Sequence, residues 1–367
     1  MKVAVLGAGN GGCAAAADLT LRGFSVSLYS RRLQTLKPII EAGGINLLDD
    51  SGEKFVTFTG VTDDLETALR DAEVILIVVP ALGHDYFAEQ CARFLDENQV
   101  IVLNPGSTGG ALHFFQKLQQ LTTKFIPPIC ETNTLTYICR LVESDKIKIS
   151  LYQKNVLFAA FPGKFIDRCV KVVQEIYPKV RPVENVLITS LLNFNAIMHP
   201  PGTIMNAGWI EFTKGNFAYY YEGNTTSVCR VMEAVDRERM LIFKELNIPS
   251  LRFLDFFYRS GLTTKKGFKS DSLYTAIQES EPDRFIRAPE SLDNRYLHED
   301  IGYGLVPMVQ IGKVLNVKTP VMRSLITIAS IAANRDYMEW GLNAKKMGIE
   351  GLNSKTLLQY LNEGKSG

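Results

Sequence analysis

The chain of 367 residues has 40 basic and 39 acidic side chains, so its formal net charge is 40 − 39 = +1. This balance gives no electrostatic attraction to nucleic acid or to an acidic membrane, and we expect neither as a partner. Hydrophobic residues make up 46% and charged residues 22%, which excludes a disordered chain, and the length favours two domains because single cores stop growing at roughly 250–300 residues.

The first third of the chain alternates short β-branched runs with amphipathic stretches of helical length. We predict strands at Val3–Leu6, Ser25–Tyr29, Val74–Val79 and Val100–Leu103, with helices at Gly12–Leu21 and Leu65–Asp71. The run Val74–Val79 has no polar alternation, which is typical of a central strand that is covered on both faces. This order of elements predicts βαβ units and a doubly wound parallel sheet.

The pattern changes in the second half of the chain. Up to Pro182 we still expect mixed elements: a helix at Gly110–Leu121, strands at Lys146–Tyr152 and Val156–Ala160, and a helix at Phe165–Tyr177. Beyond it we predict long helices at Val186–Met198, Val228–Leu246, Tyr303–Leu315 and Pro320–Met338. The sequence therefore predicts an α/β domain at 1–181 and a mainly α-helical domain at 182–367, which would carry the substrate site.

No segment predicts a membrane span, an export signal or a metal site. The longest apolar run, Val74–Leu82, is interrupted by Pro80 and is far shorter than a bilayer requires. The apolar start of the chain ends at Gly7, which is too early for a signal peptide, so we expect a cytoplasmic protein. The six cysteines never form a CxxC pair, and we therefore expect packing thiols rather than zinc ligands or disulfides.

A glycine-rich segment follows the first predicted strand and begins the first helix. Its sequence, Gly7-Ala8-Gly9-Asn10-Gly11-Gly12, matches GxGxxG, and the second strand ends about 20 residues later, as in a Rossmann dinucleotide-binding domain. Gly7 would form the tight turn, Gly9 would let the pyrophosphate approach, and Gly12 would pack the helix on the sheet. Because a helix N-terminus offers free N–H groups to phosphate, we assign the whole segment to cofactor binding.

The end of the second predicted strand discriminates between the two nicotinamide cofactors. An acidic residue there would bond the 2′-hydroxyl of NAD, but the chain has Ser30-Arg31-Arg32 after Tyr29. A hydroxyl and two guanidinium groups suit a 2′-phosphate. We therefore favour NADP(H) and keep NAD(H) as the alternative, in which the basic turn is solvated and Arg31 stacks on the adenine.

Further candidates lie where later strands end, at the edge where doubly wound sheets bind ligands. Pro80 and His84 follow the third strand, and Asn104 follows the fourth. We assign all three to cofactor contact, although a helix start explains His84 and an ordinary strand-to-helix turn explains Asn104 equally well. Glu131 and Thr132 are further candidates to line the same cleft and to bind substrate.

Several motifs resemble those of the octopine/nopaline (opine) dehydrogenase family, in the same order and over nearly the whole chain. They are Val79–His84, Val102–Ala111, Glu131–Tyr137, Asn193–Asn206, Tyr221–Gly223 and Ser291–Pro307. The resemblance implies a Rossmann domain followed by an α-helical domain. It also implies the reaction: an NAD(P)H-dependent reductive condensation of an α-keto acid, such as pyruvate, with the amino group of an amino acid through an imine.

The resemblance further implies the catalytic residues. His199 matches the family's catalytic histidine, and Arg295 with Asp300 matches its Arg and Asp pair. Histidine suits proton transfer near neutral pH, and Asp300 would orient its ring. Arg295 would hold a substrate carboxylate with two parallel bonds. An Arg and an Asp five residues apart do not share one helical stripe, which favours an irregular or bent segment.

Two features leave alternatives open. Trp209 stands where Arg is common in the family; facing the pocket it would favour an apolar or cationic amine side chain, and otherwise it is a packing residue. His298 lies between Arg295 and Asp300 and is a rival to His199.

Two other functions compete with this assignment. A ketopantoate-reductase-like or glycerol-3-phosphate-like enzyme would reduce a ketone without an amine and would use a lysine, for which Lys214 and Lys244 are available. The third possible function is that of a non-catalytic NADP(H)-sensing module. We expect small-molecule substrates as partners and consider a homodimer.

Overall fold

The computed structural model describes residues 1–122 and 125–365 and divides the chain into two compact units. One unit contains Met1–Ser190 and the residues from Gln359 on, and the other contains Leu191–Leu358. The division comes nine residues after the predicted one at 181/182, and the chain's end returns to the first unit. The return has a packing cause, because the ring of Tyr360 lies 5.1 Å from that of Phe161 in the first unit.

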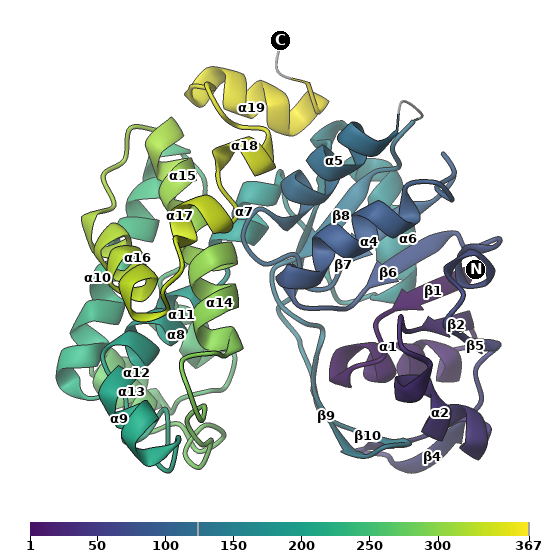
Figure 1. The fold of residues 1–367 in the computed structure, drawn as a ribbon, viewed down its shortest axis with the longest axis horizontal. Coiled ribbons are helices and arrows are strands. Elements are labelled where there is room, and N and C mark those ends of the chain that lie inside the picture. The colour runs from purple at the N-terminus through teal and green to yellow at the C-terminus, as the bar shows by residue number, and fades with distance from the viewer. Residues whose placement is uncertain (123–124, 366–367) are drawn as a thin grey trace. The chain divides into compact units, whose positions relative to one another are not determined.

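The first unit is built on an eight-stranded sheet, and the predicted doubly wound α/β fold is confirmed (Figure 1). The strand order is β12-β11-β8-β7-β6-β1-β2-β5. These strands are β1 (Lys2–Leu6), β2 (Ser25–Tyr29), β5 (Gly60–Thr62), β6 (Val74–Ile77), β7 (Val100–Leu103), β8 (Ile129–Thr132), β11 (Leu157–Phe161) and β12 (Arg181–Pro182). All neighbours are parallel except β8 and β11.

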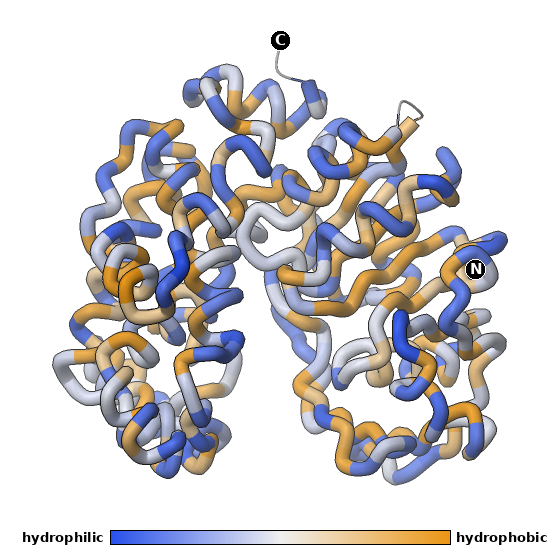
Figure 2. Tube along the Cα trace, viewed as in Figure 1, coloured by the Kyte–Doolittle hydropathy of each residue, from blue (hydrophilic) through white to orange (hydrophobic). Residues whose placement is uncertain are grey.

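Helices cover both faces of this sheet. They are α1 (Asn10–Leu21), α2 (Leu33–Ala42), α3 (Leu65–Leu69), α4 (His84–Cys91), α5 (Gly110–Leu121) and α6 (Ile166–Ile176). Because side chains alternate along a strand, Val100 and Val102 join one apolar cluster with Cys13 of α1 and Val173 of α6. Figure 2 shows the central strands mostly in the colour of hydrophobic residues, as burial on two faces requires.

A second sheet of four strands, in the order β4-β3-β10-β9, was predicted only in part. Its strands are β3 (Ile45–Asp49), β4 (Gly52–Val56), β9 (Tyr137–Glu143) and β10 (Lys146–Tyr152), of which only β10 corresponds to a predicted strand. Four of the five residues of β4 are exposed, so this strand has almost no apolar pattern to recognise. The sheet is fixed to α1, because the Leu141 N–H of β9 donates to Asn10 Oδ1 at 2.8 Å.

The second unit is helical, as predicted. Apart from one isolated bridge between Ala218 and Arg287, the regular elements that the structure describes in it are helices. They include α8 (Asn195–Ile204), α9 (Ala207–Thr213), α10 (Thr226–Glu245), α11 (Phe253–Arg259), α12 (Lys265–Lys269), α13 (Leu273–Gln278), α14 (Arg295–Asp300), α15 (Val306–Val314), α16 (Pro320–Ala332), α17 (Tyr337–Trp340) and α18 (Ala344–Met347). The predicted helix 186–198 is two helices, α7 (Val186–Leu191) and the start of α8, and α19 (Ser354–Glu363) is the last helix in the order of the chain.

Candidate active site

The glycine turn between β1 and α1 is explained largely by packing. Gly7 has a φ of +116°, and a Cβ there would lie 2.6 Å from the Val78 carbonyl oxygen. A Cβ on Gly12 would lie 1.6 Å from the Gly7 carbonyl oxygen, so only glycine lets the helix start this close to the turn. Both residues are therefore required by the fold itself, with or without a ligand.

Gly9 differs from its neighbours, because a Cβ there would meet nothing within 4 Å. Packing inside the protein therefore does not explain this glycine, whereas the close approach of a pyrophosphate does. Gly9 is also the N-cap of α1, and neither a side-chain cap nor an acidic residue occupies the first turn of that helix. The free N–H groups and the positive end of the helix dipole thus fit a dinucleotide.

The basic turn after β2 lies beside this glycine turn, because Leu6 of β1 pairs with Tyr29 of β2. Ser30 is buried, while Arg31 and Arg32 are exposed. The Arg31 guanidinium lies over the Tyr86 ring, 5.4 Å from its centroid. No acidic residue takes part in this contact, so the exposed cations are available to a phosphate.

Two of the predicted cofactor residues are buried instead of facing a ligand. His84 begins α4 but is only 1% exposed, and burial lowers its pKa to about 3, so it is a neutral packing residue. Asn104 is fully buried, and its amide donates to Thr136 Oγ1 at 2.9 Å and to the Tyr177 hydroxyl at 3.2 Å. Pro80, three residues after the end of β6, is exposed.

Glu131 and Thr132, predicted to bind substrate, lie in the interior of the first unit. Both are 0% exposed. The Glu131 carboxylate accepts hydrogen bonds from the Ala111 N–H at 2.8 Å, Thr189 Oγ1 at 2.6 Å and Ser190 Oγ at 2.9 Å. Burial raises its pKa to about 7. This carboxylate therefore connects the start of α5 to the end of the first unit, which is a structural role.

In the second unit the structure brings His199 and Asp300 into direct contact. His199 lies in α8, Asp300 is the last residue of α14, and each is 6% exposed. The distance from His199 Nδ1 to Asp300 Oδ2 is 2.7 Å. An ionised carboxylate only accepts, so Nδ1 carries a proton and the neutral ring keeps its lone pair on Nε2.

The contact between His199 and Asp300 depends on the close approach of α8 to the segment that follows α14. After Asp300 the chain forms a π-helical turn, Ile301–Leu305, before α15 begins. Gly304 lies in that turn, and a Cβ on it would be 2.7 Å from the Cβ of Ala196 in α8. Because Ala196 precedes His199 by three residues and Gly304 follows Asp300 by four, the contact of Gly304 with Ala196 and the contact of His199 with Asp300 lie on the same helix faces.

Three tyrosines that were not predicted as site residues surround the imidazole. The Tyr220 hydroxyl lies 3.0 Å from His199 Nε2. The Tyr296 ring stacks on the imidazole at 3.9 Å between centroids and 18° between planes. The Tyr219 hydroxyl donates to the His199 carbonyl at 2.9 Å. Neither the Tyr219–Tyr221 run nor the position of Tyr296 after Arg295 has a spacing that indicates contact with residue 199.

The two remaining predicted substrate residues are exposed. The Arg295 side chain is 68% exposed, and its Nε and Nη2 lie 2.9 and 2.8 Å from Glu299 Oε2. Trp209 is 40% exposed and stacks on Phe217 at 3.9 Å with 4° between the rings. Trp209 is therefore a packing residue on one face of its ring, while the rest of the ring stays accessible.

The rival residues have other surroundings. His298 is held between the Tyr337 hydroxyl at 2.6 Å and Asp293 at 2.8 Å. Lys214 and Lys244 are exposed.

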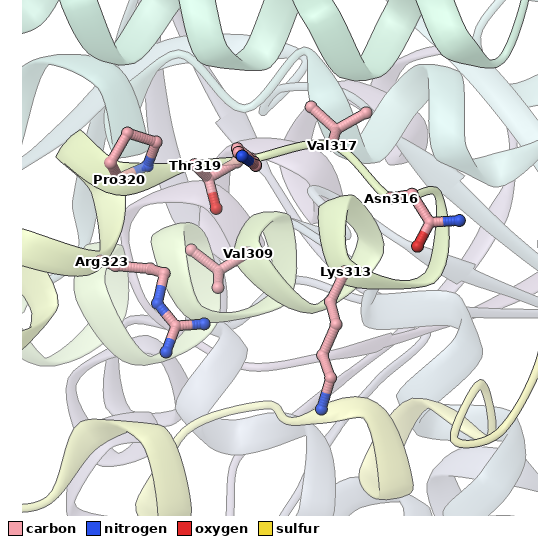
Figure 3. A pocket seen from close by; sticks show the side chains of 8 residues that line it. Val309, Lys313, Asn316, Val317, Thr319, Pro320 and Arg323 are labelled. Carbon is pink, nitrogen blue, oxygen red and sulfur yellow. The ribbon is translucent and has the colours of Figure 1, made fainter.

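Elsewhere in the second unit, a surface cavity of about 470 Å³ lies between α15 and the start of α16, where Lys313 and Arg323 point the same way (Figure 3). It contains none of the predicted site residues. Across residues 1–122 and 125–365, no group of three His, Cys, Asp or Glu side chains could hold a metal. The helices of the same residues include none with the length and apolarity to cross a membrane.

Comparisons with known proteins agree with both halves of this arrangement. The family described as NAD/NADP octopine/nopaline dehydrogenase, alpha-helical domain, matches residues 182–333. The family described as NAD-dependent glycerol-3-phosphate dehydrogenase N-terminus matches residues 2–137. An opine dehydrogenase of Arthrobacter sp. (strain 1C) is 36% identical over 352 residues, which are 95% of each chain.

Solved structures are similar over the whole chain. An octopine dehydrogenase with NADH and L-arginine has a TM-score of 0.79 at 18% identity, over 100% of this chain and 99% of that one. A yersinopine dehydrogenase with NADP⁺ has a TM-score of 0.76 at 13% identity, over 99% and 97%. At these identities the likeness shows the fold alone.

Proposed function

The chain belongs to the opine dehydrogenase family, and from that premise we propose that it condenses an α-keto acid such as pyruvate with an amino acid at the His199 site, with NADPH as the preferred reductant. The family's members are NAD(P)-dependent oxidoreductases that act on CH–NH bonds. The observation that supports this assignment of the site is the buried contact of 2.7 Å between His199 and Asp300.

Condensation requires a group that exchanges protons near neutral pH. The amino group must lose a proton before it attacks the keto acid, and the hydroxyl of the adduct must gain one before it leaves as water. The His199 imidazole can do both, since Asp300 fixes its tautomer and stabilises the imidazolium that forms. The nicotinamide cofactor, when bound, supplies the hydride that reduces the imine.

Substrate binding is assigned to two exposed side chains of the second unit. Arg295 carries a permanent charge and is 68% exposed, so a substrate carboxylate can replace or share its contact with Glu299. Trp209 presents an exposed aromatic face next to Phe217. Such a face favours an apolar or cationic amine side chain over an acidic one.

A matrix of keto acids and amino acids with NADPH, followed at the nicotinamide absorbance, tests the reaction. We expect little NADPH oxidation with pyruvate alone and rapid oxidation once a suitable amino acid is added. Equal rates without any amine would instead support a simple ketone reductase.

The preference for NADPH rests on Ser30, Arg31 and Arg32, with no acid at the end of β2. We expect Arg31→Ala to raise KM for NADPH about 10- to 150-fold, which corresponds to a charge-assisted hydrogen bond of ~1.5–3 kcal/mol. KM for NADH should stay the same. Arg93→Ala is the matched control, because Arg93 also lies over a ring, that of Phe94 at 5.6 Å. Equal affinity of the parent enzyme for both cofactors would contradict the preference.

The cytoplasmic location and the homodimer remain predictions from the sequence. Light scattering on the purified protein measures the oligomeric state directly.

A further inference from the structure

Both ring nitrogens of His199 are already engaged by the protein. Nδ1 contacts Asp300 at 2.7 Å, and Nε2 contacts the Tyr220 hydroxyl at 3.0 Å. One face of the ring is covered by Tyr296. A reacting group therefore has no bare nitrogen on this histidine with which to exchange a proton.

The direction of the two hydrogen bonds follows from the donors available. Asp300 only accepts, so Nδ1–H donates to it, and the neutral ring must accept at Nε2. The Tyr220 O–H is the donor there. A phenol oxygen that donates its one proton keeps lone pairs that can accept a hydrogen bond from a third group.

On this geometry, and resting on the proposed function, we propose that Tyr220 is a catalytic residue: its hydroxyl relays the proton between the reacting amine or hydroxyl of the substrate and His199 Nε2. Tyr220 is 7% exposed, and its O–H is the one that the structure places on Nε2. The nearby Tyr219 cannot substitute, since its hydroxyl contacts the His199 carbonyl and Thr203.

The relay is balanced in protons. When the substrate ammonium loses a proton, the proton goes to the Tyr220 oxygen while the Tyr220 proton moves to Nε2. The phenol is regenerated and the imidazole becomes imidazolium beside Asp300. The reverse exchange delivers the same proton to the hydroxyl of the adduct, which leaves as water.

The two transfers must be concerted. Burial, reinforced by the neighbouring Tyr296, raises the pKa of the Tyr220 hydroxyl well above its usual value. A free phenolate is therefore not an accessible intermediate at neutral pH. Two protons accordingly move in one step, and this can be measured.

The decisive variant is Tyr220→Phe, which keeps the ring and removes the relay atom. In single-turnover measurements with NADPH, a keto acid and an amino acid, we expect the rate to fall about 100-fold, with the Kd for NADPH unchanged. A fall of less than about threefold, or a faster rate, would mean that the hydroxyl merely occupies Nε2 until substrate displaces it, and would overturn the relay.

Tyr337→Phe is the matched control. It removes another buried tyrosine hydroxyl from a histidine nitrogen, that of His298 at 2.6 Å, in the same unit. We expect its rate to stay within about threefold of the parent. An equal loss in both variants would show a general cost of removing such a bond and would also overturn the relay.

A second measurement uses the parent enzyme, so it holds even if Tyr220→Phe does not fold. The single-turnover rate is measured in mixtures of H₂O and D₂O on the flat part of the pH profile. Two protons in flight give a curved dependence on the deuterium fraction, and a linear dependence or no isotope effect overturns the proposal. A Tyr220→Phe variant that folds should lose the curvature, and curvature retained there counts against Tyr220.

These experiments separate the relay from the proposed function. A parent enzyme without amine-dependent NADPH oxidation fails the proposed function before Tyr220 is tested. A parent enzyme with that activity and with an unaffected Tyr220→Phe variant fails the relay alone.

Discussion

The glycine turn of the first unit and the histidine site of the second are built in opposite ways. The turn is a continuous segment, Gly7–Gly12, whose closest contacts come from its own backbone and from Val78 and Val79, which directly follow strand β6. The histidine site is assembled from α8, from Tyr220 before α10, and from α14. A local site depends on backbone conformation, whereas an assembled site depends on how closely its helices pack. Perturbations should therefore affect the two sites differently.

The largest expected effect is on the assembled site. His199→Ala should lower kcat by about 10²–10⁴-fold, while the Kd for NADPH, measured by fluorescence titration, stays near that of the parent because the glycine turn is untouched. Asp300→Asn should also lower kcat, and the double variant should be little worse than His199→Ala, since residues that act as one unit are lost together.

A second histidine with a carboxylate partner provides the control for this experiment. His298 also has a carboxylate partner, Asp293 at 2.8 Å, so His298→Ala should leave kcat within a small factor. Fully additive losses for His199 and Asp300 would show that the two act independently.

The next largest effect concerns the pH dependence of stability, in which two buried carboxylates differ. Asp300 faces an imidazole, but Glu131 faces only hydroxyl and N–H donors. Burial raises the pKa of Glu131 from 4.5 to about 7, so the unfolded chain releases this proton at lower pH than the folded protein does. The contribution of Glu131 to stability is therefore fully present below pH 4.5 and is lost as the pH rises through 7, by on the order of 3 kcal/mol.

Urea unfolding at several pH values measures this contribution. The free energy of unfolding of the parent, relative to that of Glu131→Gln, should decrease between pH 4.5 and 7 and level off above. A constant difference across this range would mean that Glu131 does not titrate there.

Two glycine variants test separately how the glycine turn contributes to cofactor binding and to folding. Gly9→Ala should fold normally, because its Cβ meets nothing within 4 Å, but should raise the Kd for NADPH about 10-fold or more by keeping the pyrophosphate at a distance. Gly12→Ala should instead lower stability by ~1–3 kcal/mol or more, because its Cβ would lie 1.6 Å from the Gly7 carbonyl oxygen. Thermal unfolding and fluorescence titration separate the two outcomes. If Gly9→Ala bound NADPH as the parent does, the phosphate would not approach this residue.

The smallest expected effect probes helix packing at the histidine site. Gly304→Ala places a methyl group 2.7 Å from the Ala196 Cβ, so α8 and the π-helical turn must separate and the contact between His199 and Asp300 should lengthen. We expect kcat to fall about 10-fold, with a stability loss of ~1–3 kcal/mol. Gly208→Ala, in α9 with nothing within 4 Å of its Cβ, is the control for an added methyl group in the same unit. An unchanged kcat in Gly304→Ala would show that α8 and the π-helical turn can accommodate the methyl group without moving His199 away from Asp300.

Features that are encoded locally could be predicted from the amino-acid sequence. Unbroken apolar runs such as Val74–Ile77 are typical of central strands, and the GxGxxG turn carries its backbone requirements in consecutive residues. The two-part α/β and helical architecture followed from the change of hydrophobic period near Pro182. Where a strand lacks a buried face, as in β4, this information is absent, and most of the second sheet was missed.

Which polar residues contact one another became clear only from the folded structure. His84, Asn104 and Glu131 stand at positions that suit a ligand site, but the structure buries them, and two of the three have their hydrogen bonds satisfied inside the first unit. Conversely, Tyr220 and Tyr296 have no informative spacing and yet surround His199. The physical reason is that contacts between helices depend on interhelical packing, which Gly304 and Ala196 set here, and such packing leaves no periodic pattern in the chain.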